Sequence, residues 1–225
     1  NMGPEKLKKA EKMDVKIILS AASLLALATV PHAALAQEVH GMVSLNTSQL
    51  FKDGFRLSGD NPTMKTAVTI PVTNGFALEG FVNKEISGTT SDEADTGMSD
   101  SFQLDDKTSV RLYTAYDWMR DIPDIIESTV SVTHERATVA ATRYTLPHAL
   151  DGYRLEANYR LNPTDKVTVK AGILHEGGLG LPRDVNAGVA DASVELKSNL
   201  FLDGRLVLPV NGDPVKAAMS LRFAF

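Results

Sequence analysis

Apolar and polar residues alternate along most of the chain after residue 36. The clearest case is the last segment, where Met219, Leu221, Phe223 and Phe225 share one face and the residues between them include Arg222. A period of two predicts a β-strand with one apolar and one polar face. Similar runs recur upstream, and no helical periodicity of useful length interrupts them. We therefore expect an all-β, antiparallel, up-and-down barrel.

About ten strands are predicted from these runs. They lie near residues 39–50, 63–71, 76–85, 108–119, 125–144, 153–161, 166–176, 187–198, 205–210 and 215–225. Run 125–144 reads as one long strand or as a hairpin broken near His134-Glu135-Arg136, so any count from eight to twelve remains open. An even count places both chain ends on the periplasmic side of a membrane barrel.

Turn-forming residues separate the runs. They are Asn74-Gly75, Asn162-Pro163-Thr164-Asp165, Asp203-Gly204 and Asn211-Gly212-Asp213-Pro214. Such combinations favour tight turns because Gly and Asn tolerate positive φ and Pro fixes its own φ. The segment from Ser87 to Asp106 is rich in Ser, Thr, Asp and Gly, which predicts a long acidic loop. Short turns thus alternate with longer polar connections.

The first 36 residues have the three parts of a secretory signal peptide. A lysine-rich start precedes the apolar run from Ile17 to Val30, and the small residues Ala34 and Ala36 flank a cleavage position. The run shows no polar face, unlike an amphipathic helix, and it is short for a membrane anchor. We expect a helical signal peptide with an N-terminal extension over residues 1–36 and a β-barrel domain over 37–225.

Composition narrows the function classes. The 225 residues carry a net charge of −5, which argues against a nucleic-acid partner. The absence of Cys excludes disulfides, thiol nucleophiles and Cys-ligated metals. No apolar run reaches the roughly 18 residues of a spanning helix. A membrane β-barrel is compatible with these observations. Its apolar and polar residues alternate along each strand, so the mean hydropathy of a spanning strand stays low.

Three features favour a membrane barrel over a soluble one. Aromatic residues such as Trp118, Tyr153 and Tyr159 lie near strand ends on the apolar face, where interfacial girdles form. Short turns alternate with longer loops, and the runs are close to the 9–11 residues of a tilted spanning strand. The alternative is a soluble periplasmic barrel that binds a small ligand inside, as lipocalins do.

The carboxy-terminal alternation that ends on Phe223 and Phe225 resembles the closing strand of bacterial outer-membrane β-barrel proteins. The stretch from Leu57 to Pro62, with Asn74-Gly75-Phe76, is similar to exported barrels of Gram-negative bacteria. The resemblance implies a location in the outer membrane, contact with its lipid, and recognition of Phe223 and Phe225 by the barrel-assembly machinery. It implies a narrow porin-like channel or a structural surface protein.

The polar strand faces carry ionisable groups of both signs that would face the lumen. The candidates are Arg111, Asp117, Glu127, Arg154, Glu156, Arg160, Lys170, Glu195 and Arg222. They predict either a pore lining that selects solutes or a plug of mutual ion pairs. The plug is favoured here, because a barrel of about ten strands has a narrow interior.

Nothing in the sequence predicts catalysis, a cofactor or a metal site. His134-Glu135 and His175-Glu176 lack a second His at the spacing of a helical zinc site. In a strand, Ser131 and Glu135 share one face while His134 points to the other, which breaks a local triad. Acidic residues crowd segment 87–106, but their spacing is not that of a calcium-binding loop. We therefore predict a non-enzymatic protein, with an outer-membrane lipid hydrolase as the alternative.

Overall fold

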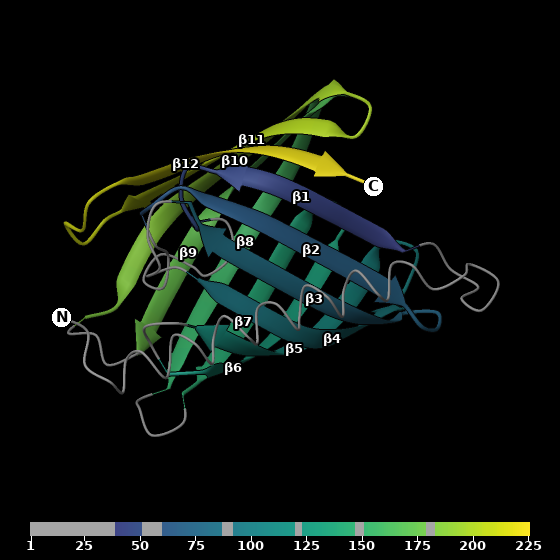
Figure 1. Ribbon diagram of the computed structural model, residues 1–225, viewed down its shortest axis with the longest axis horizontal. Coiled ribbons are helices and arrows are strands. Elements are labelled where there is room, and N and C mark those ends of the chain that lie inside the picture. Colours follow the sequence, from purple (N-terminus) through teal and green to yellow (C-terminus); the bar gives the residue numbers. More distant parts are fainter. Residues whose placement is uncertain (1–38, 51–59, 87–91, 120–122, 147–150, 179–182) are drawn as a thin grey trace.

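The computed structural model describes residues 39–50, 60–86, 92–119, 123–146, 151–178 and 183–225. They form twelve antiparallel strands (Figure 1). The strands are β1 (His40–Asn46), β2 (Thr63–Pro71), β3 (Phe76–Glu85), β4 (Glu93–Gln103), β5 (Thr108–Met119), β6 (Ile125–His134), β7 (Ala137–Thr145), β8 (Gly152–Thr164), β9 (Val167–Gly178), β10 (Val185–Lys197), β11 (Leu200–Pro209) and β12 (Lys216–Ala224). Within these ranges no helix is long and apolar enough to cross a membrane.

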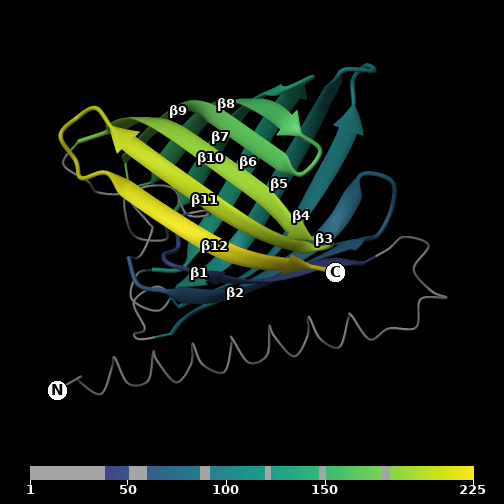
Figure 2. The same cartoon turned by 90° about the horizontal axis from the view of Figure 1, so that it is seen from above.

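Each strand pairs with its neighbours in sequence, and β1 pairs with β12 to close the barrel (Figures 1 and 2). The seam continues past β12, where Gly41 N–H donates to Phe225 O at 2.7 Å and Phe225 N–H donates to Gly41 O at 2.9 Å. The Phe225 ring lies over Gly41, since a Cβ there would come within 2.4 Å of the ring. Closure leaves no open sheet edge among the twelve strands.

The predicted count of about ten is two strands short, for two reasons. First, segment 125–144 is the hairpin β6–β7, with a turn at Glu135 and Arg136 in which Glu135 has a φ of 50°. Second, β4 occupies most of the segment predicted as an acidic loop. Its outward side has only two large apolar residues, Met98 and Phe102, so its alternation is weak. Pairing with β3 and β5 on both sides fixes it as a strand despite poor β-propensity.

Two of the predicted turns are misplaced. Asp203-Gly204 lies inside β11, and the turn before it is at Ser198 and Asn199, where Asn199 has a φ of 66°. β8 runs on to Thr164, so its turn is at Asp165 and Lys166. Asn and Asp tolerate turn geometry in many contexts, so the residue types alone did not locate the break.

The other turn signals are correct. Gly75 and Gly212 have φ values of 94° and 79°, which only glycine adopts without strain. In the turn between β4 and β5, Lys107 N–H donates to Asp105 Oδ1 at 2.8 Å and holds the pKa of that carboxyl below its ordinary value. Turns at the end of the barrel that holds Phe225 are short, and strand bounds at the other end are further apart. The same asymmetry is typical of outer-membrane barrels, whose short turns lie on the periplasmic side.

The two faces of the wall differ in chemistry as predicted. Outward positions are apolar and exposed, as on β6, where Ile126, Val130 and Val132 are 40–49% exposed. Inward positions on the same strand hold Glu127, which is buried, and Thr129. Aromatic rings pack on the outer face near strand ends, with Tyr116 and Trp118 5.2 Å apart and Phe223 and Phe225 6.3 Å apart between ring centroids. An apolar exterior requires lipid around it.

The orientation of β6 gives a first prediction. Val130→Arg places a charge on the lipid face at mid-strand and should destabilise the barrel by about 2–4 kcal/mol. Ser131→Arg, one residue on, points inward and should cost much less. Urea unfolding in lipid vesicles measures the difference. Equal losses for the two variants would contradict the assigned faces.

The seam gives a second prediction. Deleting Phe225 removes both backbone hydrogen bonds with Gly41 and the ring that covers it. The deletion should reduce the amount of heat-modifiable, folded barrel recovered from outer membranes, as judged by gel mobility. Phe102→Ala, which removes an exposed outward ring away from the seam, should leave that amount close to wild type. Wild-type recovery after the deletion would argue against a role for Phe225 in closure.

Candidate functional site: the barrel lumen

The residues predicted to face the lumen all occupy inward positions of the strands. Arg111 and Asp117 lie on β5, Glu127 on β6, Glu195 on β10 and Arg222 on β12. Arg154, Glu156 and Arg160 lie on β8, and Lys170 lies on β9. Of the remaining predicted positions, Phe223 and Phe225 point outward, while Ala34 and Ala36 lie outside the described residues.

One group of charges centres on Arg205 of β11. Its guanidinium lies 3.2 Å from Glu156 of β8 and 3.6 Å from Asp191 of β10. Arg154 Nε approaches the same glutamate at 3.9 Å, and Asn158 donates to it at 2.8 Å. Glu156 thus joins two arginines, and neutralisation by a partner is what makes such largely buried charges tolerable.

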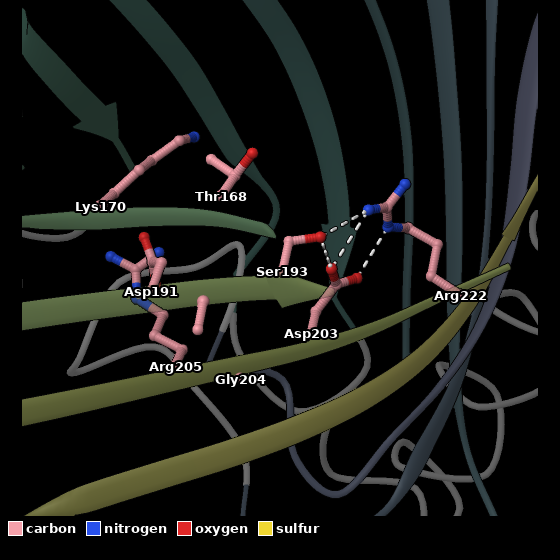
Figure 3. A pocket seen from close by; sticks show the side chains of 9 residues that line it. Thr168, Lys170, Asp191, Ser193, Asp203, Gly204, Arg205 and Arg222 are labelled. Carbon is pink, nitrogen blue, oxygen red and sulfur yellow. Dashed lines mark hydrogen bonds and ion pairs between the residues drawn. The ribbon is translucent and has the colours of Figure 1, made fainter. Parts of the chain in front are cut away.

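A second group lies at the closing strands (Figure 3). Arg222 of β12 donates to both carboxylate oxygens of Asp203 on β11, at 2.7 and 3.1 Å, in a bidentate pair. Ser193 of β10 donates to the same carboxylate at 2.6 Å. β10, β11 and β12 are consecutive strands, so Ser193, Asp203 and Arg222 lie side by side on the wall. A further pair lies across the barrel, on the arc of the wall formed by β3 to β5. There Arg111 of β5 pairs with Glu79 of β3, and Glu79 also accepts a hydrogen bond from Ser99.

These pairs bear on the predicted plug. The mutual pairing is present, but each pair described here joins strands on one arc of the wall. Space remains beside them. A cavity of about 270 Å³ is lined by Lys170, Asp191, Asp203, Arg205 and Arg222 (Figure 3), and one of about 170 Å³ lies on the other arc near Lys65 and Glu79. Arg222–Asp203 and Arg205–Asp191 join adjacent strands, whereas Arg205–Glu156 joins β11 to β8.

The residues after β1 occupy part of the lumen, which the sequence did not predict. Leu50 is 1% exposed and packs on inward apolar residues of β9 to β12. That patch consists of Leu174, Val185, Ala187, Val189, Val207 and Ala218. The adjacent Gln49 donates to Glu93 on β4. Residues 49 and 50 thus contact both arcs of the wall. They narrow the lumen in the half of the barrel away from the short turns, which we call the outer half.

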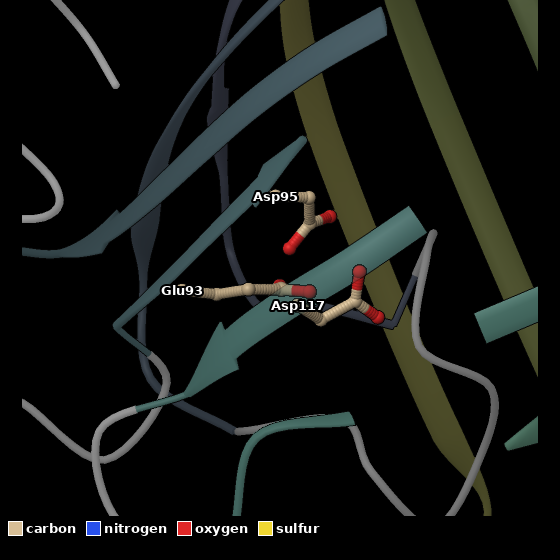
Figure 4. Close-up of side chains that lie close together, drawn as sticks. All are labelled: Glu93, Asp95 and Asp117. Atoms are coloured by element: carbon tan, nitrogen blue, oxygen red, sulfur yellow. The ribbon is translucent and has the colours of Figure 1, made fainter. Parts of the chain in front are cut away.

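Three buried carboxylates gather on the arc that Gln49 contacts (Figure 4). Glu93 and Asp95 of β4 and Asp117 of β5 have carboxylate oxygens within 4.8 Å of one another. Asp95 and Asp117 are direct cross-strand neighbours. Only Asp117 was predicted at the lumen. The signal for the other two was their spacing of two residues, which puts both on one face of a strand.

The periplasmic half carries exposed cations. Arg160 and Lys170 are cross-strand neighbours on β8 and β9, and with Arg136 they line a cavity of about 160 Å³. Within the described ranges, neither Arg160 nor Lys170 takes part in an ion pair. The two histidine motifs lie elsewhere: His134 points outward and contacts Thr108 Oγ1 at 2.9 Å, and His175 points outward near the opposite rim. His134 and Ser131 are on opposite faces, as predicted.

Comparisons with known proteins identify the fold. No family model matches the chain, and no curated protein matches it in sequence. Its structure is similar to the KdgM porin, with a TM-score of 0.62 and 11% identity over 83% of this chain and 99% of that one. The KdgM porin in complex with disordered oligogalacturonate gives a TM-score of 0.61 at 10% identity over the same shares. The NanC porin gives 0.53 at 9% identity, over 83% and 98%. The chain has the fold of these outer-membrane porins.

The position of Leu50 generates a third prediction. Leu50→Ala removes about 2–5 kcal/mol of packing on the inner wall. The population in which residues 49 and 50 pack on the inner wall should fall by about 30-fold or more relative to the population in which they do not. Single-channel conductance in a planar bilayer should therefore rise. Leu208→Ala on the outer face of β11 is the matched control, and an unchanged conductance in Leu50→Ala would show that this contact does not set the width.

Proposed function

We propose that this protein is a narrow porin-like channel of the bacterial outer membrane, through which small polar solutes diffuse passively. The observation that carries the proposal is the layout of the luminal charges. Arg205, Arg222 and Arg111 pair with acids on their own arc of the wall, and cavities remain beside them. A purely structural barrel would gain more from filling its interior with pairs or apolar side chains.

The outer face supports the membrane location. Its exposed apolar side chains lie on strand after strand, an arrangement that suits lipid and that water penalises. It offers no support to the soluble, lipocalin-like alternative, in which apolar residues would point inward. Lipid of the outer membrane is therefore the first partner we propose. The barrel-assembly machinery is the second, with Phe223 and Phe225 as the signal it reads.

Luminal charge indicates which solutes are favoured. The outer half presents buried carboxylates at Glu85, Glu93, Asp95, Asp117 and Glu176. A solute entering from outside passes these carboxylates, of which Glu176 has Arg154 as its cross-strand neighbour, before it reaches Arg160 and Lys170 near the periplasmic end. We propose that neutral and cationic solutes pass more readily than anions. Oligogalacturonate, the polyanion bound by a similar porin, is therefore not the ligand we assign to this chain.

No catalytic step is part of the proposal. Among the described residues, His134 and His175 point away from the lumen, and neither lies with a serine and an acid as base, nucleophile and orienting group. A channel function needs only the pore and its lining. The pore also accounts for the retention of many charges inside a barrel where each costs desolvation energy.

The fourth prediction tests both the channel and its charge preference. Purified protein in a planar bilayer under a KCl gradient should show discrete conductance steps and a reversal potential of the sign for cation preference. Asp117→Asn keeps the shape and removes one charge, so its reversal potential should move toward zero. Asp100→Asn on the outer face of the same β4–β5 hairpin is the control and should behave as wild type.

Two outcomes would contradict the proposal separately. Absence of conductance from correctly folded protein would overturn the channel function. Anion preference, or no change in Asp117→Asn, would overturn only the proposed selectivity.

A further inference from the structure

A groove crosses the outer face of four consecutive strands, β7 to β10. It has a volume of about 680 Å³, and its outward lining includes Val139, Ala141, Leu155, Ala157, Ile173 and Gly188. Small residues at Ala141, Ala157 and Gly188 make it concave. A Cβ built at Gly188 meets nothing within 4 Å, so this part of the groove has room for a ligand. A second hollow of about 520 Å³ continues it over β5 to β8 and shares Ala141 and Leu155.

A polar cluster stands at the extracellular end of this groove, also on the outer face. His175 Nδ1 lies 2.8 Å from Asn186 Oδ1, and His175 Nε2 lies 3.0 Å from the Tyr153 hydroxyl. Tyr153 donates to Asp184 Oδ2 at 3.1 Å. His175 and Asn186 also border the groove itself. Polar groups on the outward face of a membrane strand are costly unless they meet water or a polar partner.

The cluster keeps polar edges open to its surroundings. The side chains of His175 and Asp184 are 35% and 50% exposed, so their mutual hydrogen bonds leave room for further ones. The nearby cations already have anionic partners: Arg183 lies 3.2 Å from Asp213, and Arg143 lies 2.6 Å from Asp151. A carboxylate, an amide and an aromatic ring suit the hydroxyl groups and the apolar face of a sugar better than they suit a phosphate.

We propose that this face is a binding site for a glycolipid. The acyl chain lies in the groove across Ala141, Ala157 and Gly188, and the sugar headgroup binds to Tyr153, His175, Asp184 and Asn186. The spatial order supports this occupant, because an amphiphile standing in the outer leaflet has its polar end at the same level as the cluster and its chain beside the apolar strands. The site is independent of the lumen and of any channel activity.

The test is native mass spectrometry of the whole folded barrel in detergent. The probes are lipid A, its dephosphorylated form, and a phosphatidylglycerol with acyl chains of the same length. Wild type should bind both lipid A forms about tenfold more tightly than phosphatidylglycerol. Binding that is lost with the phosphates would overturn recognition through hydroxyls, and equal binding of all three lipids would overturn the site.

Two variants separate chain from headgroup. Gly188→Leu fills the groove and should weaken binding of lipid A about tenfold. Gly204→Leu is the matched control, since it is an outward glycine of β11 whose Cβ has equal room. His175→Ala should reduce lipid A to the level of phosphatidylglycerol. Gel mobility checks folding, and Ala157→Leu replaces Gly188→Leu if that variant does not fold.

The same spectra distinguish another occupant. A dimer of the wild-type barrel that disappears in Gly188→Leu but persists in Gly204→Leu would assign the groove to a second copy of the chain and overturn the glycolipid. Equal lipid A binding by Gly188→Leu and Gly204→Leu would also overturn it.

Discussion

Backbone hydrogen bonding in lipid is the constraint on which the rest of this structure depends. A sheet surrounded by hydrocarbon has no water to satisfy its edge strands, so the sheet has to close on itself. Here the closing contact is the pairing of β1 with β12, extended by the reciprocal bonds between Gly41 and Phe225. Glycine at position 41 is part of this solution because the Phe225 ring occupies the space a side chain would need.

Closure determines the chemistry of both faces. With the apolar side chains directed to lipid, the polar side of every strand is confined to the interior, where charges need partners. The partners come from adjacent or nearby strands, as with Arg222 and Asp203 on β12 and β11. Pairing within one arc satisfies the charges without closing the space between arcs. The interior can therefore hold many ionisable groups and still keep open space between the arcs.

The sequence predicted the fold class and the facing of the strands because alternation with period two is a local property. It failed where the decisive interaction is nonlocal. β4 has little apolar character and is held by two neighbours, so its residues read as a loop. Leu50 is an ordinary apolar residue in sequence, and only the assembled patch from β9 to β12 gives it a place in the lumen. Pairings such as Arg205 with Glu156 depend on the strand count and register.

The interior patch that receives Leu50 also explains an irregularity of the wall. Inward positions of a channel are expected to be polar, yet Val185, Val189 and Val207 are apolar and buried. Their apolar character is intelligible if they serve as a surface for a segment of the chain, since burial of Leu50 against them removes apolar area from the water of the lumen. On the facing arc, Gln49 meets a carboxylate instead. Residues 49 and 50 thus contact two chemically different surfaces, an apolar one on β9 to β12 and a carboxylate on β4. These two contacts define the position of the segment in the outer half of the barrel.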